Sequence, residues 1–517
     1  MDAAPLRVGI VPAHEHTRRP RLWSALGDAY GVRFEGRADG ATDGLDGVLV
    51  VGGEAAGRAG GATGEATRED ATAAGGAATS PTGVVPRLLM AGEEQPDANT
   101  PPRALMFSRD PALSRPLHGA RLSETHCAAR ALAGGVRDGE VVLATLDGTP
   151  AWTRAARDGE HGAPPTQRVA CAPAELAAGE ALRERLEPGR CLALLALAQF
   201  LGDLTGGATA AARGARGSGT TAAASAARAP LQAAFLIDDP NLHRPRYGHL
   251  RYAELLRDAE AHGYHLAVAM VPLDGWFADP RVARMFRAGA ARLSVCVHGN
   301  EHYGPELGRP RTVAEGVALG RRALRRVAAF ERRTGVAVDR VMVPPHERIG
   351  EPMARALVAC GFQALCTTRP YPWAVNSPEL PWLTRPADAG PLAAWRPADI
   401  VAGGLPVLLR ADFARHPRED LVLRAFLGQP LILYGHHELL RDGPDALARA
   451  AAEIDALGEV RWGSLAEIAR ACVLGTAISD PALPDPATIP LQPRRLRPIL
   501  RRVAAEGEVR LRAAVAR

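Results

Sequence analysis

The sequence predicts an α/β protein of two domains, the second of which is a distorted (β/α)7-8 barrel. Its length of 517 residues exceeds what one hydrophobic core usually holds. A stretch of small residues at 206–230 divides the chain, and strand and helix patterns alternate regularly after it. Hydrophobic residues make up 47% of the chain and charged residues 23%, a balance typical of globular proteins and not of disordered ones.

Two low-complexity segments and a biased tail set the expected domain boundaries. Residues 54–83 are rich in Ala, Gly and Thr and are expected to form a disordered insertion in a loop. Residues 206–230 can bury little and are expected to form a flexible linker. The tail at 476–517 is rich in Pro and Arg. The domains are therefore expected at 1–205 and 231–475.

The N-terminal domain alternates short apolar runs with helical patterns, which favours a doubly wound parallel sheet with helices on both faces. Strands are expected at 7–12, 47–51, 87–90, 104–107 and 141–146, and helices at 21–30, 174–186 and 191–200. The pattern distantly resembles flavodoxin-like or class I glutamine-amidotransferase-like domains. No cysteine lies in the Gly-x-Cys-x-Gly elbow of an amidotransferase. A degenerate binding or packing domain is therefore the favoured interpretation.

Strand and helix patterns alternate more regularly in the C-terminal domain. Strands are expected at 233–238, 265–271, 293–297, 340–343, 364–367, 406–409, 431–434 and 460–462. Helices are expected at 252–262, 281–288, 313–334, 352–360, 419–427 and 444–457. Seven or eight βα units fit a (β/α) barrel, which typically takes about 250 residues. An open doubly wound sheet is the alternative.

Polar residues gather where the expected strands end, and in a (β/α) barrel these ends form the active-site face. The strand AAFLI leads into Asp238 and Asp239, and LSVCV leads into His298 with His302 four residues later. The fourth and seventh strands end in a Pro-Pro-His-Glu and a His-His-Glu sequence. Stability does not require such a pattern, because unpaired buried charges are costly.

These residue types suit a catalytic metal. Two histidines four positions apart and a carboxylate from a neighbouring strand leave positions open for water and substrate. Of the two adjacent acids, one can bind the metal while the other acts as general base. We therefore expect His298, His302 and one of the adjacent acids Asp238 and Asp239 to bind a divalent metal, and the other acid to act as the base. A turn-forming acid pair and surface histidines are the alternative interpretation of the same residues.

The motifs D-D-P, H-x-x-x-H, P-P-H and a late strand ending in His resemble those of the polysaccharide deacetylases (carbohydrate esterase family four) over residues 231–472. The resemblance implies a distorted (β/α) barrel that uses a divalent metal, usually zinc, to remove acetyl groups from sugars or to cleave related amides. It gives Asp238 the role of base and makes Asp239, His298 and His302 the metal ligands. It places His436 at the position of the family's catalytic acid, with His437 as the alternative.

The third motif departs from the family, which points to a divergent branch. The family has an arginine before the prolines that orients the base, and Val343 stands in that place. Arg340, three residues earlier, or Arg410, at the end of the sixth expected strand, are the candidates to replace it. The residues expected to line the substrate site are Asn241, Asp274, Asn300, His346, Glu347 and Arg410.

The expected function is hydrolysis of a C–N bond in a sugar or related small molecule, with a catalytically degenerate carbohydrate- or ligand-binding barrel as the alternative. A third hypothesis gives the N-terminal domain a sensing or delivery role. All 62 basic residues are arginines and aromatic residues are only 5%, so nucleic-acid binding is not expected. With seven scattered cysteines and neither an export signal nor a membrane-spanning run in the sequence, a cytoplasmic protein is expected.

Overall fold

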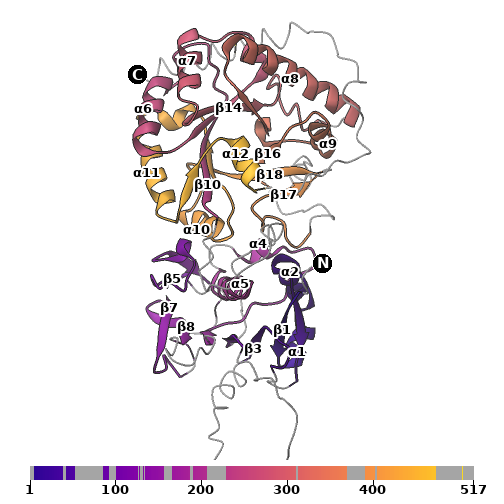
Figure 1. Cartoon of the computed structure of the whole chain (residues 1–517), viewed down its shortest axis with the longest axis vertical. Coiled ribbons are helices and arrows are strands. Elements are labelled where there is room, and N and C mark those ends of the chain that lie inside the picture. Colours follow the sequence, from indigo (N-terminus) through magenta and orange to yellow (C-terminus); the bar gives the residue numbers. More distant parts are fainter. Residues whose placement is uncertain are drawn as a thin grey trace, which may run out of the picture. The chain divides into compact units, whose positions relative to one another are not determined.

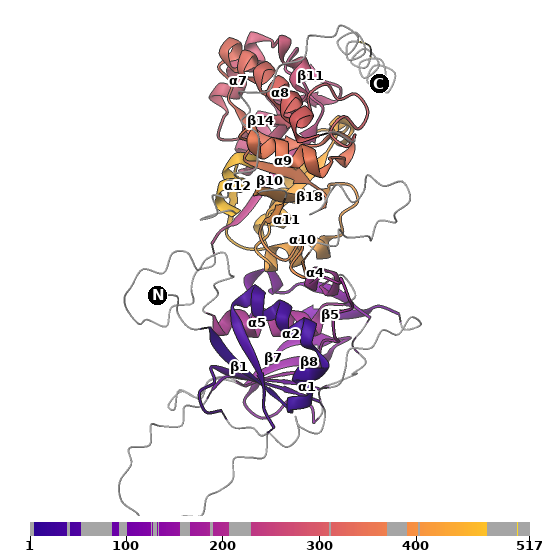
Figure 2. The same ribbon diagram turned by 90° about the vertical axis from the view of Figure 1, so that its right-hand side faces the viewer.

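The computed structural model describes residues 5–38, 42–52, 85–91, 101–125, 127, 132, 134–155, 166–186, 190–205, 229–309, 312–369, 390–401, 404–472 and 504. Contacts between residues divide the chain into two compact units (Figures 1 and 2). The first is Met1–Arg228 with Gly390–Leu392, and the second is Ala229–Ala389 with Ala393–Arg517. The expected insertion at 54–83, the linker up to residue 228 and the tail at 476–517, except residue 504, lie outside the described residues.

The first unit is built on one nine-stranded mixed sheet. Its first five strands are parallel: β2 (Val32–Gly36), β1 (Leu6–Val11), β3 (Gly47–Val51), β4 (Arg87–Met90) and β9 (Thr166–Val169). The other four are antiparallel: β8 (Thr149–Ala155), β7 (Glu140–Leu146), β5 (Arg103–Phe107) and β6 (Arg121–Glu124). The helices are α1 (Ala13–Arg18), α2 (Pro20–Tyr30), α4 (Leu182–Arg185) and α5 (Leu192–Leu204), with a 3-10 turn, η1, at Arg115–Leu117. Helix α5 is apolar on almost every side and contacts β4 and β9.

The antiparallel half corrects the expectation of a wholly parallel sheet. Asp147 and Gly148 both have positive φ, 49° and 80°, and join β7 to β8 in a two-residue hairpin. An Asp-Gly pair is a known hairpin signal, so the sequence did contain the information. The expectation of a helix at 174–186 is also wrong for residues 174–181, because α4 begins at Leu182. There the carboxylate of Glu175 accepts hydrogen bonds from the backbone N–H groups of Arg21 and Leu22 at the start of α2.

The second unit is a closed parallel barrel of seven strands. In ring order they are β10 (Leu231–Asp238), β13 (Leu266–Met270), β14 (Leu293–His298), β15 (Val338–Val343), β16 (Ala364–Thr367), β18 (Leu405–Asp412) and β19 (Leu431–Gly435). Pairing of β10 with both β19 and β13 closes the ring, which excludes the open sheet. The eighth expected strand, β20 (Val460–Trp462), pairs only with the start of β10, and β17 (Asp399–Val401) pairs antiparallel with β18.

Helices surround the strands of this unit in Figure 1. They are α6 (Tyr252–His262), α7 (Pro280–Ala288), α8 (Val313–Thr334), α9 (Glu351–Ala359), α10 (Arg418–Phe426) and α11 (Asp445–Asp455), with a last helix, α12, at Leu465–Cys472. Helix α8 begins with a capping box of Thr312 and Glu315 and ends at Gly335, whose φ is 68°. None of the described helices has the length and apolar character needed to cross a membrane.

Helix α12, which the sequence analysis missed, covers the end of the barrel where the strands begin. Its residues Leu465 and Ile468 join the buried core inside the strands, and it contacts both β10 and β15. The backbone N–H of Ala466 donates to the carboxylate of Asp339 near the start of β15. With this end covered, the opposite end, where β10 and β14 end in Asp238 and His298, carries the polar residues.

Candidate metal centre

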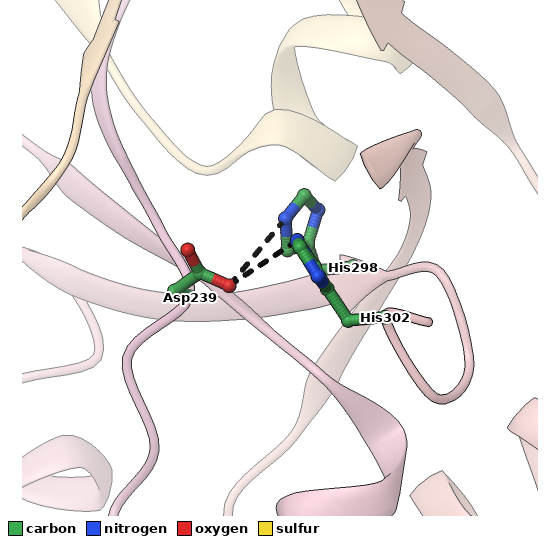
Figure 3. A group of neighbouring side chains, drawn as sticks. All are labelled: Asp239, His298 and His302. Carbon is green, nitrogen blue, oxygen red and sulfur yellow. Dashed lines mark ion pairs between the residues drawn. The ribbon is translucent and has the colours of Figure 1, made fainter. Parts of the chain in front are cut away.

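Asp239, His298 and His302 converge on one point at the end of the barrel where the strands end (Figure 3). Asp239 follows β10 directly and has a φ of 80°, His298 is the last residue of β14, and His302 lies in the next loop with a φ of 52°. One potential ligand atom from each side chain lies within 4.8 Å of the others. Positive φ is uncommon for residues other than glycine, so two of the three side chains are aimed by unusual backbone conformations.

The donor atoms fit a divalent cation. Oδ1 of Asp239 lies 3.4 Å from Nε2 of His302 and 3.9 Å from Nε2 of His298. A shared ion with bonds of about 2 Å requires separations of this order. Nδ1 of His298 lies 2.9 Å from the backbone oxygen of Val343, so Nε2 is the nitrogen left to face the carboxylate. Second-shell hydrogen bonds of this kind orient metal-binding histidines. Two histidines and one carboxylate form the donor set of open, catalytic zinc sites.

A buried carboxylate, Glu306, holds the loop that carries His302. It accepts hydrogen bonds from the backbone N–H groups of Asn300, Glu301 and His302, at distances of 2.6 to 3.1 Å. Burial raises the pKa of Glu306, although the three N–H donors oppose the shift. Gly299, with a φ of 63°, is required here because a Cβ atom would overlap the Glu306 carboxylate and Pro345. The sequence analysis missed Glu306, for which an acid in a Gly- and Pro-rich loop was the only signal.

Asp238, beside the metal cluster, is buried in an ion pair with Arg410. Two guanidinium nitrogens of Arg410 donate to the two carboxylate oxygens of Asp238, at 2.8 and 2.9 Å. Burial by itself would raise the pKa of Asp238, but the charges of Arg410 and His298 outweigh it and hold this pKa below its ordinary value. Asp238 therefore stays ionised at neutral pH, as a general base must.

Glu347 holds Arg410 from the other side. Nε of Arg410 donates to Oε1 of Glu347 at 2.8 Å, and Nη2 contacts the same oxygen. The second oxygen of Glu347 accepts from the Thr367 hydroxyl and from the Thr368 backbone, at 3.0 and 2.9 Å. The guanidinium also stacks on Tyr434, with its carbon 3.8 Å from the ring centroid. Arg410 is thus fixed on three sides, and it in turn fixes Asp238.

The geometry distinguishes the two arginines that could replace the family's base-orienting residue. Arg410, on β18, pairs with Asp238, although the two residues are 172 positions apart in the chain. Arg340 instead pairs with Glu331 of α8, and both of those side chains are partly exposed. Arg410 is therefore the residue positioned to orient Asp238.

Three further histidines lie at this end of the barrel. The ring of His346, in the 3-10 turn η4 (Pro345–Glu347), lies 4.9 Å from that of His302. His436 is exposed, and its charge helps to lower the pKa values of Asp238 and His346. His437 is buried against the backbone of Gly248, and its Nδ1 has no hydrogen-bond partner among the described residues. Both His436 and His437 stay candidates for the catalytic acid.

The remaining predicted site residues are buried supports of the loops. Asn241 accepts from the His243 backbone and, through its own backbone oxygen, from the Tyr252 hydroxyl. The side-chain oxygen of Asn300 accepts from Arg326 at 2.7 Å. Asp274 lies in the 3-10 turn η3 (Pro272–Trp276). These three predicted residues are each at most 3% exposed, and their contact with a substrate stays a prediction.

No family model and no curated protein matches this chain. Among solved structures, the chain is similar to a protein from Mycobacterium smegmatis that is described as a polysaccharide deacetylase. The two are 15% identical over 47% of this chain and 89% of the other, with a TM-score of 0.32. It is also similar to a family 4 carbohydrate esterase domain of a xylanase from the hindgut metagenome of Trinervitermes trinervoides, at 9% identity over 46% of this chain and 90% of the other, with a TM-score of 0.28.

A third similar structure is a family 4 pseudoenzyme from Bacillus anthracis, at 13% identity over 46% of this chain and 66% of the other, with a TM-score of 0.29. All three similarities cover just under half of this chain. All three similar structures are described as polysaccharide deacetylases or as members of carbohydrate esterase family 4.

Proposed function

We propose that the barrel is a metal-dependent hydrolase that cleaves an amide bond, such as that of an N-acetyl group, in a sugar or related small molecule. The observation that carries the proposal is the convergence of Asp239, His298 and His302 beside an ionised, buried Asp238. A structural role alone does not explain this arrangement, because it concentrates titratable groups where burial penalises their charged forms. Zinc is the proposed metal because the donor set matches its open sites.

The proposed roles follow from the contacts of each residue. Asp239, His298 and His302 hold the cation, which when bound lowers the pKa of water and polarises a carbonyl group. Asp238 takes the proton from the attacking water, and Arg410 holds both of its oxygens in place. His436 or His437 returns a proton to the leaving nitrogen.

One observation favours a second candidate function, a barrel that binds a carbohydrate or other ligand without turning it over. The bidentate contact with Arg410 engages both oxygens of Asp238 and lowers its pKa, which makes it a weaker base.

Hydrolysis that depends on metal separates the two candidates. The purified full chain is expected to release acetate from an N-acetylated amino sugar, to lose this activity after chelation, and to regain it with added zinc or cobalt. Acetate is assayed directly, and the melting temperature is followed in parallel so that unfolding is not mistaken for loss of the metal. Ligand binding without any acetate release, before and after metal addition, would support the binding protein.

A further inference from the structure

The short loop between the two histidine ligands is held by charged side chains on two sides. On one side, the buried carboxylate of Glu306 accepts hydrogen bonds from three consecutive backbone N–H groups of the loop. On the other side, Arg326 of α8 donates to the loop. Its Nη1 donates to the backbone oxygen and to Oδ1 of Asn300, at 3.2 and 2.7 Å, and its Nη2 donates to Oε1 of Glu301 at 3.0 Å. The N–H groups of the loop thus meet an acid, and its oxygens meet a guanidinium.

Arg326 reaches the loop from a fixed position. It lies in the 22-residue helix α8, and its side chain is only 22% exposed. Phe330, one turn later on the same face of the helix, is fully buried and packs against η3, where a Cβ atom on Gly275 would lie 3.4 Å from it. The N–H of Leu273, also in η3, donates at 3.0 Å to the same backbone oxygen of Asn300 that Arg326 contacts. Helix α8, η3 and the loop therefore pack together and hold the guanidinium in place.

The conformation of the loop decides where the second histidine points. His302 has a φ of 52°, which is uncommon for a residue other than glycine and has to be stabilised by the contacts around it. Arg326 supplies such contacts to Asn300 and Glu301, the two residues that precede His302. Groups that orient the ligands of a metal typically contribute about 10- to 100-fold to its affinity.

Resting on the proposed function, we infer that Arg326 is a positioning residue of the metal centre. By holding the loop, it keeps Nε2 of His302 facing Oδ1 of Asp239, 3.4 Å away, and so raises the affinity for the cation. The sign of this effect is distinctive, because a positive side chain near a cation site by itself weakens binding through repulsion. Positioning and repulsion therefore predict opposite results when the arginine is removed.

The zinc affinity of the full chain, measured by competition with a chelating dye, distinguishes the two effects. Arg326→Met removes the guanidinium and is expected to weaken zinc binding by about 10- to 100-fold. Repulsion alone would make zinc bind more tightly to this variant. Arg325→Met is the matched control, because Arg325 is the exposed neighbour of Arg326 on the same helix. The same loss of positive charge at Arg325 should leave the affinity unchanged or slightly higher.

Two further variants test whether the effect passes through the loop. Glu301→Gln should also weaken zinc binding, and adding it to Arg326→Met should cause little further loss, because both changes remove the same contact. Arg326→Lys keeps the charge but not the planar fork that reaches Asn300 and Glu301 together, so its affinity should lie between those of Arg326→Met and the wild type. At saturating zinc, kcat of these variants should stay close to the wild-type value, since positioning acts on metal binding.

The outcomes separate this inference from the proposed hydrolysis. Unchanged or tighter zinc binding by Arg326→Met and Arg326→Lys, with the fold retained by circular dichroism, would overturn the inference and leave the hydrolase intact. Additive losses in the double variant would overturn it as well, because the two residues would then act separately. The expected loss of affinity in a chain that never releases acetate would support the positioning role and refute the hydrolase. A wild-type chain that binds no zinc would refute both.

Discussion

Replacing Arg410 with methionine is expected to lower the free energy of unfolding by about 3–5 kcal/mol, the usual effect of removing one partner of a buried ion pair. Arg410 is only 2% exposed and lies between two carboxylates, those of Asp238 and Glu347. Methionine fills a similar volume but leaves both acids without their cation. Hydrolysis by the folded fraction is expected to fall strongly as well, because Asp238 loses the group that orients it.

The stability effect has a defined pH dependence. The pKa of Asp238 lies below its ordinary value of 3.8, so the ion pair contributes fully above about pH 4 and is lost as the pH falls through the lowered pKa. The difference in unfolding free energy between wild type and Arg410→Met should therefore narrow in acid. Without Arg410, less positive charge opposes the effect of burial, so the pKa of Asp238 should rise.

Urea unfolding monitored by circular dichroism, at neutral pH and in acid, measures these effects. Arg340→Met is the matched control, because its pair with Glu331 is partly exposed and should contribute about 1 kcal/mol or less. Equal losses for the two variants at neutral pH would show that Arg410 does not hold a buried network.

Replacing Asp238 with asparagine is expected to reduce kcat by about 10²- to 10⁴-fold, the usual contribution of a general base. Asparagine keeps the shape of the side chain but cannot accept the proton. Metal content should be unchanged, since Asp238 points its two oxygens at Arg410, whereas Asp239 faces the two histidines.

Steady-state kinetics and elemental analysis on the same preparation measure both quantities. Asp455→Asn is the control, because that carboxylate is exposed and accepts a hydrogen bond from the ring N–H of Trp462 at 2.8 Å. A loss of metal in Asp238→Asn would mean that the roles of the two adjacent acids are exchanged, and unchanged turnover would remove Asp238 from the reaction.

Local patterns in the sequence were enough to predict most of the barrel. Helix α8 occupies the predicted residues 313–334, since its apolar periodicity is bounded by the capping residues Thr312 and Gly335. The strand ends were also clear, because apolar runs stop abruptly at charged residues. The convergence of three site residues was predicted from the rule that the parallel strands of a barrel all end on one face. The structure brings the three together: Asp239, His298 and His302.

Contacts between distant segments could not be predicted in the same way. The pairing of Arg410 with Asp238 joins residues 172 positions apart, and closure of the ring by pairing of β10 with β19 depends on the twist of the whole sheet. The left-handed backbone of His346 and Glu347, with φ of 58° and 56°, is set by the packing around them and not by their own preferences. In the first unit, the alternation of strand and helix patterns did not predict the hairpin at Asp147-Gly148, whose signal lies in the turn residues and not in the apolar runs.

The metal content of the purified chain tests the metal site most directly. Elemental analysis should find close to one divalent ion, most of it zinc, in each wild-type chain, and almost none in Asp239→Ala or His298→Ala with the fold retained by circular dichroism. A wild-type chain that is free of metal and gains no thermal stability from added zinc would contradict the account, as would variants that bind the ion as well as the wild type does.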